Sequence, residues 1–258
     1  DIFIKRISYS KLLFSDPENF FSQKKISLPF NFENKVKKPL WSWSKKTISQ
    51  IFDIAPENYS AFFSNKKLSF FEGASTWILP IEDNLSLPVL QFRKTIKTKN
   101  YLGIYSFEEI LAHEAVHMAR VAFEDSKYEE IFAYLTSSSS FRRTLGAVIQ
   151  HKWEVLVFFS FVFSAVISQF MFLNSLSIFL WFCSFLFLSL GLIRLFFLKL
   201  VLKKAHILIS KYVKNNKKAL FVLFRCSDEE IKMFSKISMK EFTQYVDSKK
   251  HSSIRWKI

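Results

Sequence analysis

Residues 106–123 read Ser-Phe-Glu-Glu-Ile-Leu-Ala-His-Glu-Ala-Val-His-Met-Ala-Arg-Val-Ala-Phe, a stretch that carries the signals of one helix. Ser106 with Glu109 three residues later is a capping-box pattern, which predicts a helix over residues 107–123. Apolar residues occupy nearly every side of that helix, so we expect it to be buried. His113 and His117 stand four residues apart and therefore project from one face.

The segment His113-Glu114-Ala115-Val116-His117 places two imidazoles and a carboxylate in an otherwise apolar helix. Buried polar side chains need partners, and a metal ion shared by His113 and His117 would satisfy them. Glu114 lies beside the histidines, where it can polarise a metal-bound water instead of binding the metal. Zinc lowers the pKa of such a water, and a carboxylate then removes its proton as it attacks a carbonyl. The segment predicts a hydrolytic zinc site, against the alternative of ordinary hydrogen-bonded histidines.

A third protein ligand is expected on the next helix, predicted over residues 128–136 after a charged break. Glu129 and Glu130 follow His117 by 12 and 13 residues. We favour Glu130 because Ala133, three residues further on, is small and would let two helices approach closely. Glu129 remains a competitor. Both could instead form a solvated acidic first turn, which the helix dipole favours.

Two segments, His113-Glu114-Ala115-Val116-His117 and Glu130-Ile131-Phe132-Ala133, carry a resemblance to a known family. The chain resembles the zincin metallopeptidases that hold zinc with two histidines and a glutamate. The second segment is similar to the Glu-x-x-Ala pattern of membrane metallopeptidases of the CAAX-prenyl-protease type, which place a cytosol-facing zinc site beside membrane helices. The resemblance implies zinc on His113, His117 and Glu130, with Glu114 as general base.

The match covers a small part of the chain and departs from the family pattern in places. Tyr134 stands where that family usually has Asp, Val116 replaces a frequent Gly, and the spacing to the glutamate is shorter. A group that stabilises the transition state is also expected. Arg120, Tyr128 and Tyr134 are its candidates.

An apolar hairpin is predicted after this region. Residues 155–173 and 176–193 carry no charged side chain and are separated by Asn174 and Ser175. About 20 apolar residues span the hydrocarbon core of a bilayer, so each half is long enough to cross. Buried helices of a soluble protein would keep a polar outer face, and neither half has one. Basic residues flank the hairpin on both sides, so the positive-inside rule predicts both termini in the cytoplasm; they are Arg142, Arg143, Lys152, Arg194, Lys199, Lys203, Lys204 and Lys211.

Weaker signals surround these two features. A short helix is predicted over residues 44–54, ending before Pro56, and two strands over 75–81 and 87–97, which Pro80 and Pro88 make short or edge strands. In the tail, residues 219–225 predict a strand. Ser227 with Glu230 forms a second capping box, expected to open a helix that runs to about residue 246.

Composition limits the class of protein. Half of the residues are hydrophobic and 18% are aromatic, which excludes a disordered chain and favours partial burial in lipid. The net charge of +15 is explained by the basic flanks of the hairpin, so nucleic-acid binding is not expected. Cys183 and Cys226 are expected to be small buried side chains, without a disulfide framework.

The predicted fold is α+β, with a zincin-like domain over residues 1–140, a two-helix transmembrane hairpin over 150–202 and a basic cytosolic α/β segment over 203–258. The predicted function is that of a membrane-anchored zinc metallopeptidase, with a peptide or protein substrate and membrane lipid as partners. The alternative is a non-enzymatic membrane protein whose basic tail binds a partner or lipid. A zinc hydrolase of a non-peptide substrate would share the same site.

Overall fold

The computed structural model describes residue 36 and residues 42–54, 60–69, 72–82, 85–98, 100–121 and 127–249, and the statements below concern these residues. The chain forms two compact units. The first comprises Asp1–Asp125 with Leu135–Ser137, and the second comprises Ser126–Tyr134 with Ser138–Ile258. Each unit is described by itself.

The first unit contains a three-stranded sheet in the order β1-β3-β2. Its strands are β1 (Ser60–Phe63), β2 (Ala74–Glu82) and β3 (Leu85–Phe92). β2 and β3 are the two strands that the sequence predicts. They pair antiparallel, and β1 joins β3 in parallel. β2 is therefore an outer strand of the described sheet.

Two features of β3 differ from the prediction. Pro88 lies in the central strand, not in an edge strand, and this is tolerated because β1 pairs only with the part of β3 that begins at Val89. The strand also ends at Phe92 instead of residue 97. The backbone N–H of Lys94 donates to the side chain of Asn65 at 2.9 Å, which takes it out of the ladder, and Lys94–Lys97 forms a 3₁₀ turn.

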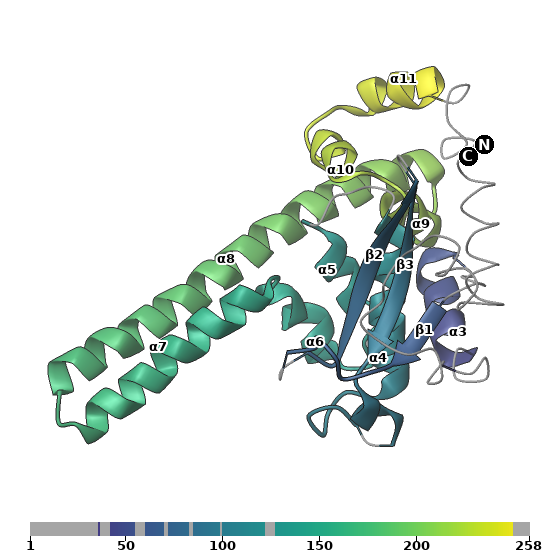
Figure 1. Cartoon of the computed structure of the whole chain (residues 1–258). Helices are drawn as coiled ribbons and strands as arrows, with labels where there is room; N and C mark the ends of the chain where they lie inside the picture. Colours follow the sequence, from purple (N-terminus) through teal and green to yellow (C-terminus); the bar gives the residue numbers. More distant parts are fainter. Residues whose placement is uncertain are drawn as a thin grey trace. The chain divides into compact units, whose positions relative to one another are not determined.

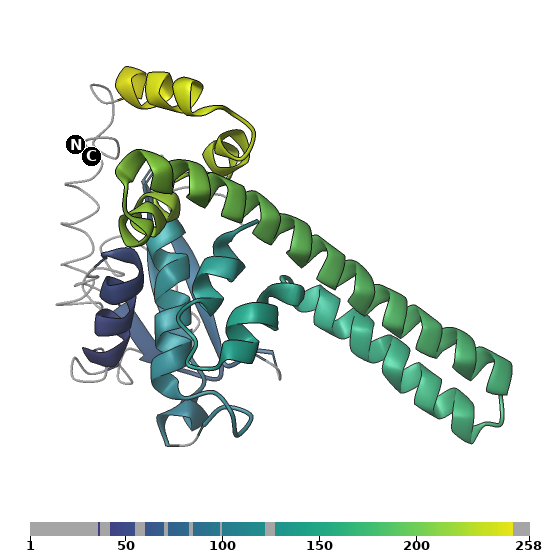
Figure 2. The same ribbon diagram turned by 180° about the vertical axis from the view of Figure 1, so that it is seen from behind.

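Two helices cover the sheet of the first unit. α3 (Ser42–Phe52) and α4 (Phe107–Arg120) pack against each other, and α4 also contacts β2 and β3. Figures 1 and 2 show the sheet from one side and the two helices from the other. Both helices are confirmed close to their predicted bounds. α4 ends at Arg120, and residues 122 and 123 of its predicted extension lie outside the described residues.

The second unit begins with short helices, α5 (Glu129–Tyr134) and α6 (Ser140–Leu145). The serine run over residues 137–140 leads into α6. Ser139 is its N-cap, and the Ser139 hydroxyl accepts from the backbone N–H of Arg142 at 3.5 Å. A 3₁₀ turn over Gly146–Val148 then leads to the long helices.

The long helices are α7 (Lys152–Phe170) and α8 (Asn174–Val213), which lie side by side as a hairpin (Figure 1). Both are long and apolar enough to cross a membrane. Only 17% of the apolar window in α7 and 11% of that in α8 is buried, whereas a core helix of a soluble protein is mostly buried. The predicted hairpin is thus present, although its second helix continues to Val213.

The tail packs on α8 as three helices, α9 (Asn216–Phe224), α10 (Asp228–Phe234) and α11 (Met239–Lys249). The predicted strand over residues 219–225 is wrong, because Asn215 caps a helix there and buries Ala219 and Leu223 on one side of it. The expected α/β segment is therefore helical throughout the described residues.

The capping box of Ser227 and Glu230 is confirmed. The helix that it opens does not run on to residue 246 as predicted, because a second cap interrupts it. The backbone N–H of Ser238 donates to Glu241 Oε2 at 2.7 Å, and the Ser238 hydroxyl accepts from the Glu241 N–H at 3.4 Å. The described residues are mostly helical with a small three-stranded sheet, which confirms the α+β class in this coarse form.

Candidate metal centre

The helix that carries the histidines begins as the sequence predicts. Ser106 is the N-cap of α4, and its hydroxyl accepts from the backbone N–H of Glu109 at 3.2 Å. Leu111, Ala112, Ala115 and Val116 are fully buried along the helix. The side chains of His113, Glu114 and His117 are half-buried between these apolar positions.

The two imidazoles face each other across one turn of α4. His113 Nε2 and His117 Nε2 are 3.2 Å apart, and the ring planes meet at 64°. Two nitrogens that each lie about 2.0–2.1 Å from one zinc ion at the tetrahedral angle are about 3.3 Å from each other. The observed spacing therefore suits two ligands of a single tetrahedral ion.

The protonation state of His113 also suits a ligand. Burial holds the pKa of His113 well below its ordinary value of 6.5, and the neighbouring His117 lowers it further. Only a neutral imidazole offers its lone pair to a metal. The lowered pKa favours the neutral, ligating form of His113.

Glu114 is held by the sheet. Thr76 Oγ1, on β2, donates a hydrogen bond of 2.7 Å to Glu114 Oε2. This carboxylate is not part of the group of ligand atoms that could hold a metal ion. Its placement beside the histidines agrees with the role expected of a base.

Glu130, the favoured third ligand, lies in the first turn of α5 in the second unit. Among the residues that the structure describes, His113, His117 and Glu130 form a group whose ligand atoms could hold a metal ion. Two imidazole nitrogens with one carboxylate oxygen form a donor set that zinc accepts in catalytic sites. Glu129 is in the same turn but outside this group.

The three candidates for a transition-state stabiliser differ in exposure. Arg120 is fully buried at the end of α4, and Tyr128 is 3% exposed. Tyr134 is half-buried, with its ring against Gly146, where a Cβ would collide with it. None of the three is an exposed side chain.

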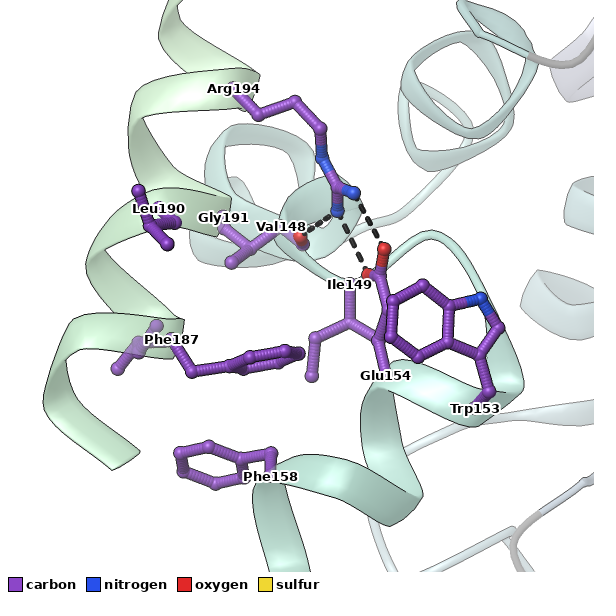
Figure 3. Close-up of a pocket in the computed structure, with 10 residues that line it drawn as sticks. Val148, Ile149, Trp153, Glu154, Phe158, Phe187, Leu190, Gly191 and Arg194 are labelled. Carbon is purple, nitrogen blue, oxygen red and sulfur yellow. Dashed lines mark hydrogen bonds and ion pairs between the residues drawn. The ribbon is translucent and has the colours of Figure 1, made fainter. Parts of the chain in front are cut away.

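A separate pocket of about 120 Å³ lies in the second unit, at the base of the hairpin (Figure 3). Its walls are mostly apolar, with Phe158 and Phe187 on one side. Arg194 reaches Glu154 with two hydrogen bonds of 2.5 and 2.8 Å and the carbonyl oxygen of Val148 with a third of 2.7 Å. Since this pocket holds one carboxylate and no imidazole, its lining does not offer the donor set of a zinc site.

Thr76 is the residue near the candidate site that the sequence did not reveal. It lies 38 residues before Glu114, in a strand whose pattern reports only burial and β propensity. The signal appears once β2 packs on α4.

Comparison of the chain with protein-family models, with curated proteins and with solved structures gives no match, so the function must be argued from these residues themselves.

Proposed function

We propose that this protein is a zinc-dependent metallopeptidase anchored in a membrane, with His113, His117 and Glu130 as ligands and Glu114 as general base. The observation that carries the proposal is the pair of imidazoles on α4, with Nε2 atoms 3.2 Å apart and a glutamate between them in sequence. A shared tetrahedral ion needs that spacing. A hydrogen bond between the two rings has the same spacing and is the alternative that the zinc measurement tests.

Each residue has a separate task in this proposal. Zinc, when bound, would supply a Lewis acid that makes a water molecule acidic and polarises the substrate carbonyl. His113 and His117 are fixed by their positions on one buried helix, and the low pKa of His113 keeps it neutral. Glu114 takes the proton of the attacking water and passes it to the leaving amine, so that the peptide C–N bond breaks with its charges balanced.

A peptide substrate is supported by the sheet next to α4. β2 pairs with β3 along one edge and is an outer strand of the described sheet. An extended peptide can add to such an edge through main-chain hydrogen bonds. Because Thr76 of this strand contacts Glu114, a peptide lying along β2 would pass close to the base.

The hairpin supports a membrane location. α7 and α8 expose large apolar side chains along their length, such as Phe163 at 67% and Phe185 at 71%, which water would not favour and lipid tails would. Basic side chains lie beyond both ends of the apolar region, including Arg142, Arg143 and Lys203. We therefore place both termini, and the metal site, on the cytoplasmic side.

Zinc content measured by elemental mass spectrometry on the detergent-purified protein tests the site. We expect about one zinc per chain in the wild type, its loss in His117→Ala, and its retention in the control His151→Ala, whose ring is exposed and lies in the second unit. A folded wild-type protein without zinc would contradict the proposal and favour a non-enzymatic membrane protein.

The third ligand and the base are tested by conservative amides. Glu130→Gln is expected to lose zinc under dialysis that leaves Glu129→Gln loaded, and the reverse result would make Glu129 the ligand. Glu114→Gln should keep its zinc and lose hydrolysis of a peptide library. Full hydrolysis by Glu114→Gln would refute the assignment of the base.

A further inference from the structure

We propose that Thr76 is a positioning residue, which holds the Glu114 carboxylate in the orientation needed to take a proton from the attacking water. The inference rests on the proposed function, because it assigns a partner to the base of that reaction. Its observation is the hydrogen bond of 2.7 Å from Thr76 Oγ1 to Glu114 Oε2, which joins the outer strand to the metal-site helix.

The direction of this hydrogen bond follows from the charge of the carboxylate. An ionised glutamate is an acceptor only, so the Thr76 hydroxyl must be the donor. Thr76 therefore donates to Oε2 and fixes the orientation of the carboxylate. The hydroxyl keeps its own proton throughout, and the proton that Glu114 carries comes from the water and goes to the leaving nitrogen.

The strand gives Thr76 a fixed place from which to donate. Threonine is β-branched, so it suits a strand and has a stiff χ1 angle. A glutamate side chain by contrast has several rotatable bonds, and one charge-assisted hydrogen bond restricts them. Thr76 lies opposite Leu90 of β3, which is fully buried, so this part of the strand is anchored in the core.

The register of β2 is secured on the opposite face of the sheet. Trp77 Nε1 donates to Gln91 Oε1 at 2.7 Å. Gln91 in turn donates through Nε2 to the carbonyl oxygens of Ser64 at 3.0 Å and Lys66 at 2.7 Å. A slip of one residue would turn Thr76 away from α4, since side chains alternate along a strand. The chain of hydrogen bonds from Trp77 opposes that slip and keeps the hydroxyl on the side of Glu114.

The test compares Thr76→Val, which removes the hydroxyl but keeps the shape, with Thr76→Ser, which keeps the hydroxyl. Ser75→Ala is the matched control, because Ser75 is the preceding residue of β2 and faces the other side of the sheet. For Thr76→Val we expect kcat to fall about 10- to 100-fold, the range for losing a hydrogen bond to a charged group. KM and zinc content should stay as in the wild type. Thr76→Ser should recover most of kcat, and Ser75→Ala should keep it.

A second readout needs neither metal nor activity. The infrared carboxylate band of Glu114 is identified in the metal-free protein as the band that Glu114→Gln loses. This band should shift in Thr76→Val and stay in place in Ser75→Ala. Should Thr76→Val fail to fold, the same measurement on Thr76→Ser, where the band should keep its position, replaces it. A shifted band in Thr76→Ser would overturn the inference.

The outcomes separate this inference from the proposed function. Wild-type kcat in Thr76→Val, beside an inactive Glu114→Gln, would overturn the role of Thr76 and leave the peptidase proposal standing. An equal loss of activity in Ser75→Ala would also overturn it, because the effect would then belong to the strand as a whole. A folded wild-type protein that binds no zinc and hydrolyses nothing would remove both proposals together.

Discussion

The ion pair between Arg194 and Glu154 at the base of the hairpin leads to a quantitative prediction. The Glu154 carboxylate is 3% exposed, and it accepts from the backbone N–H of Gln150 at 2.9 Å as well as from Arg194. The substitution Arg194→Met keeps an apolar stem of similar length and removes the guanidinium. It leaves a buried carboxylate with one of its main donors gone.

The expected loss of stability follows from the burial of Glu154 and the exposure of Arg194. Removal of one partner from a buried ion pair typically costs about 3–5 kcal/mol. The Arg194 side chain is 36% exposed, so solvent screens part of this interaction, and we expect about 2–3 kcal/mol. For a chain of this size that corresponds to a decrease of roughly 5–10 °C in the unfolding midpoint.

Thermal unfolding in detergent, followed by tryptophan fluorescence, provides the assay, because Trp153 lies in the same pocket. Lys203→Met is the control, since Lys203 is an exposed cation further along α8. The double variant Arg194→Met with Glu154→Met should recover much of the loss, because an apolar pair needs no counter-charge. An unchanged midpoint in Arg194→Met alone would refute the reasoning.

Three further predictions concern the stability of the folded chain, one of them at alkaline pH. Gly146→Ala should destabilise the second unit by about 1–3 kcal/mol in denaturant unfolding, because the new methyl group would collide with the ring of Tyr134. Ser227→Ala should cost about 1 kcal/mol in the same assay, since it removes the hydroxyl that accepts from the backbone at the start of α10. Burial, and then the charge of Asp228, raise the pKa of Tyr128 above its ordinary value. A raised pKa means that the folded state holds the proton more tightly, so this contribution to stability is complete below about pH 10 and is lost as the pH rises further.

Matched variants test these three predictions. Gly191→Ala should cost less than Gly146→Ala, because its nearest new contact, at 3.1 Å to Val148 Cγ1, requires only a small adjustment. Ser235→Ala, at the end of α10, should leave stability nearly unchanged, and an equal loss there would argue against capping. Tyr128→Phe should remove its share of the alkaline loss, and an unaltered stability profile above pH 10 would contradict the assignment to Tyr128.

The parts of the fold that the sequence predicts well are those whose signals are local. Ser106 and Ser227 predict helix starts because their side chains can cap the following turn, and the structure has both caps. The hairpin follows from a plain lack of charge over two long segments. His113 and His117 need only the period of a helix to face each other, so their pairing also follows from spacing.

The parts that the sequence mispredicts depend on contacts between distant segments. Residues 219–224 carry an apolar run that suits either a strand or a helix, and packing on α8 decides for the helix. Pro88 was expected at an edge because proline cannot donate to a strand ladder. It is tolerated in the central strand because β1 pairs with β3 only from Val89 onward, a register that no local pattern reports. Thr76 likewise has no mark in the sequence until β2 lies against α4.

The length of α8 has a mechanical consequence if the hairpin crosses a bilayer as we propose. The helix has 40 residues from Asn174 to Val213, and at 1.5 Å per residue it measures about 60 Å. The hydrocarbon core is only about 30 Å thick, so nearly half of the rod must stand in water. Neither glycine nor proline interrupts α8 after Gly191, and α9, α10 and α11 all rest on it. A change in membrane thickness that tilts α8 would therefore move the tail helices together with it. The part of α8 outside the bilayer would transmit a change in the lipid to the tail.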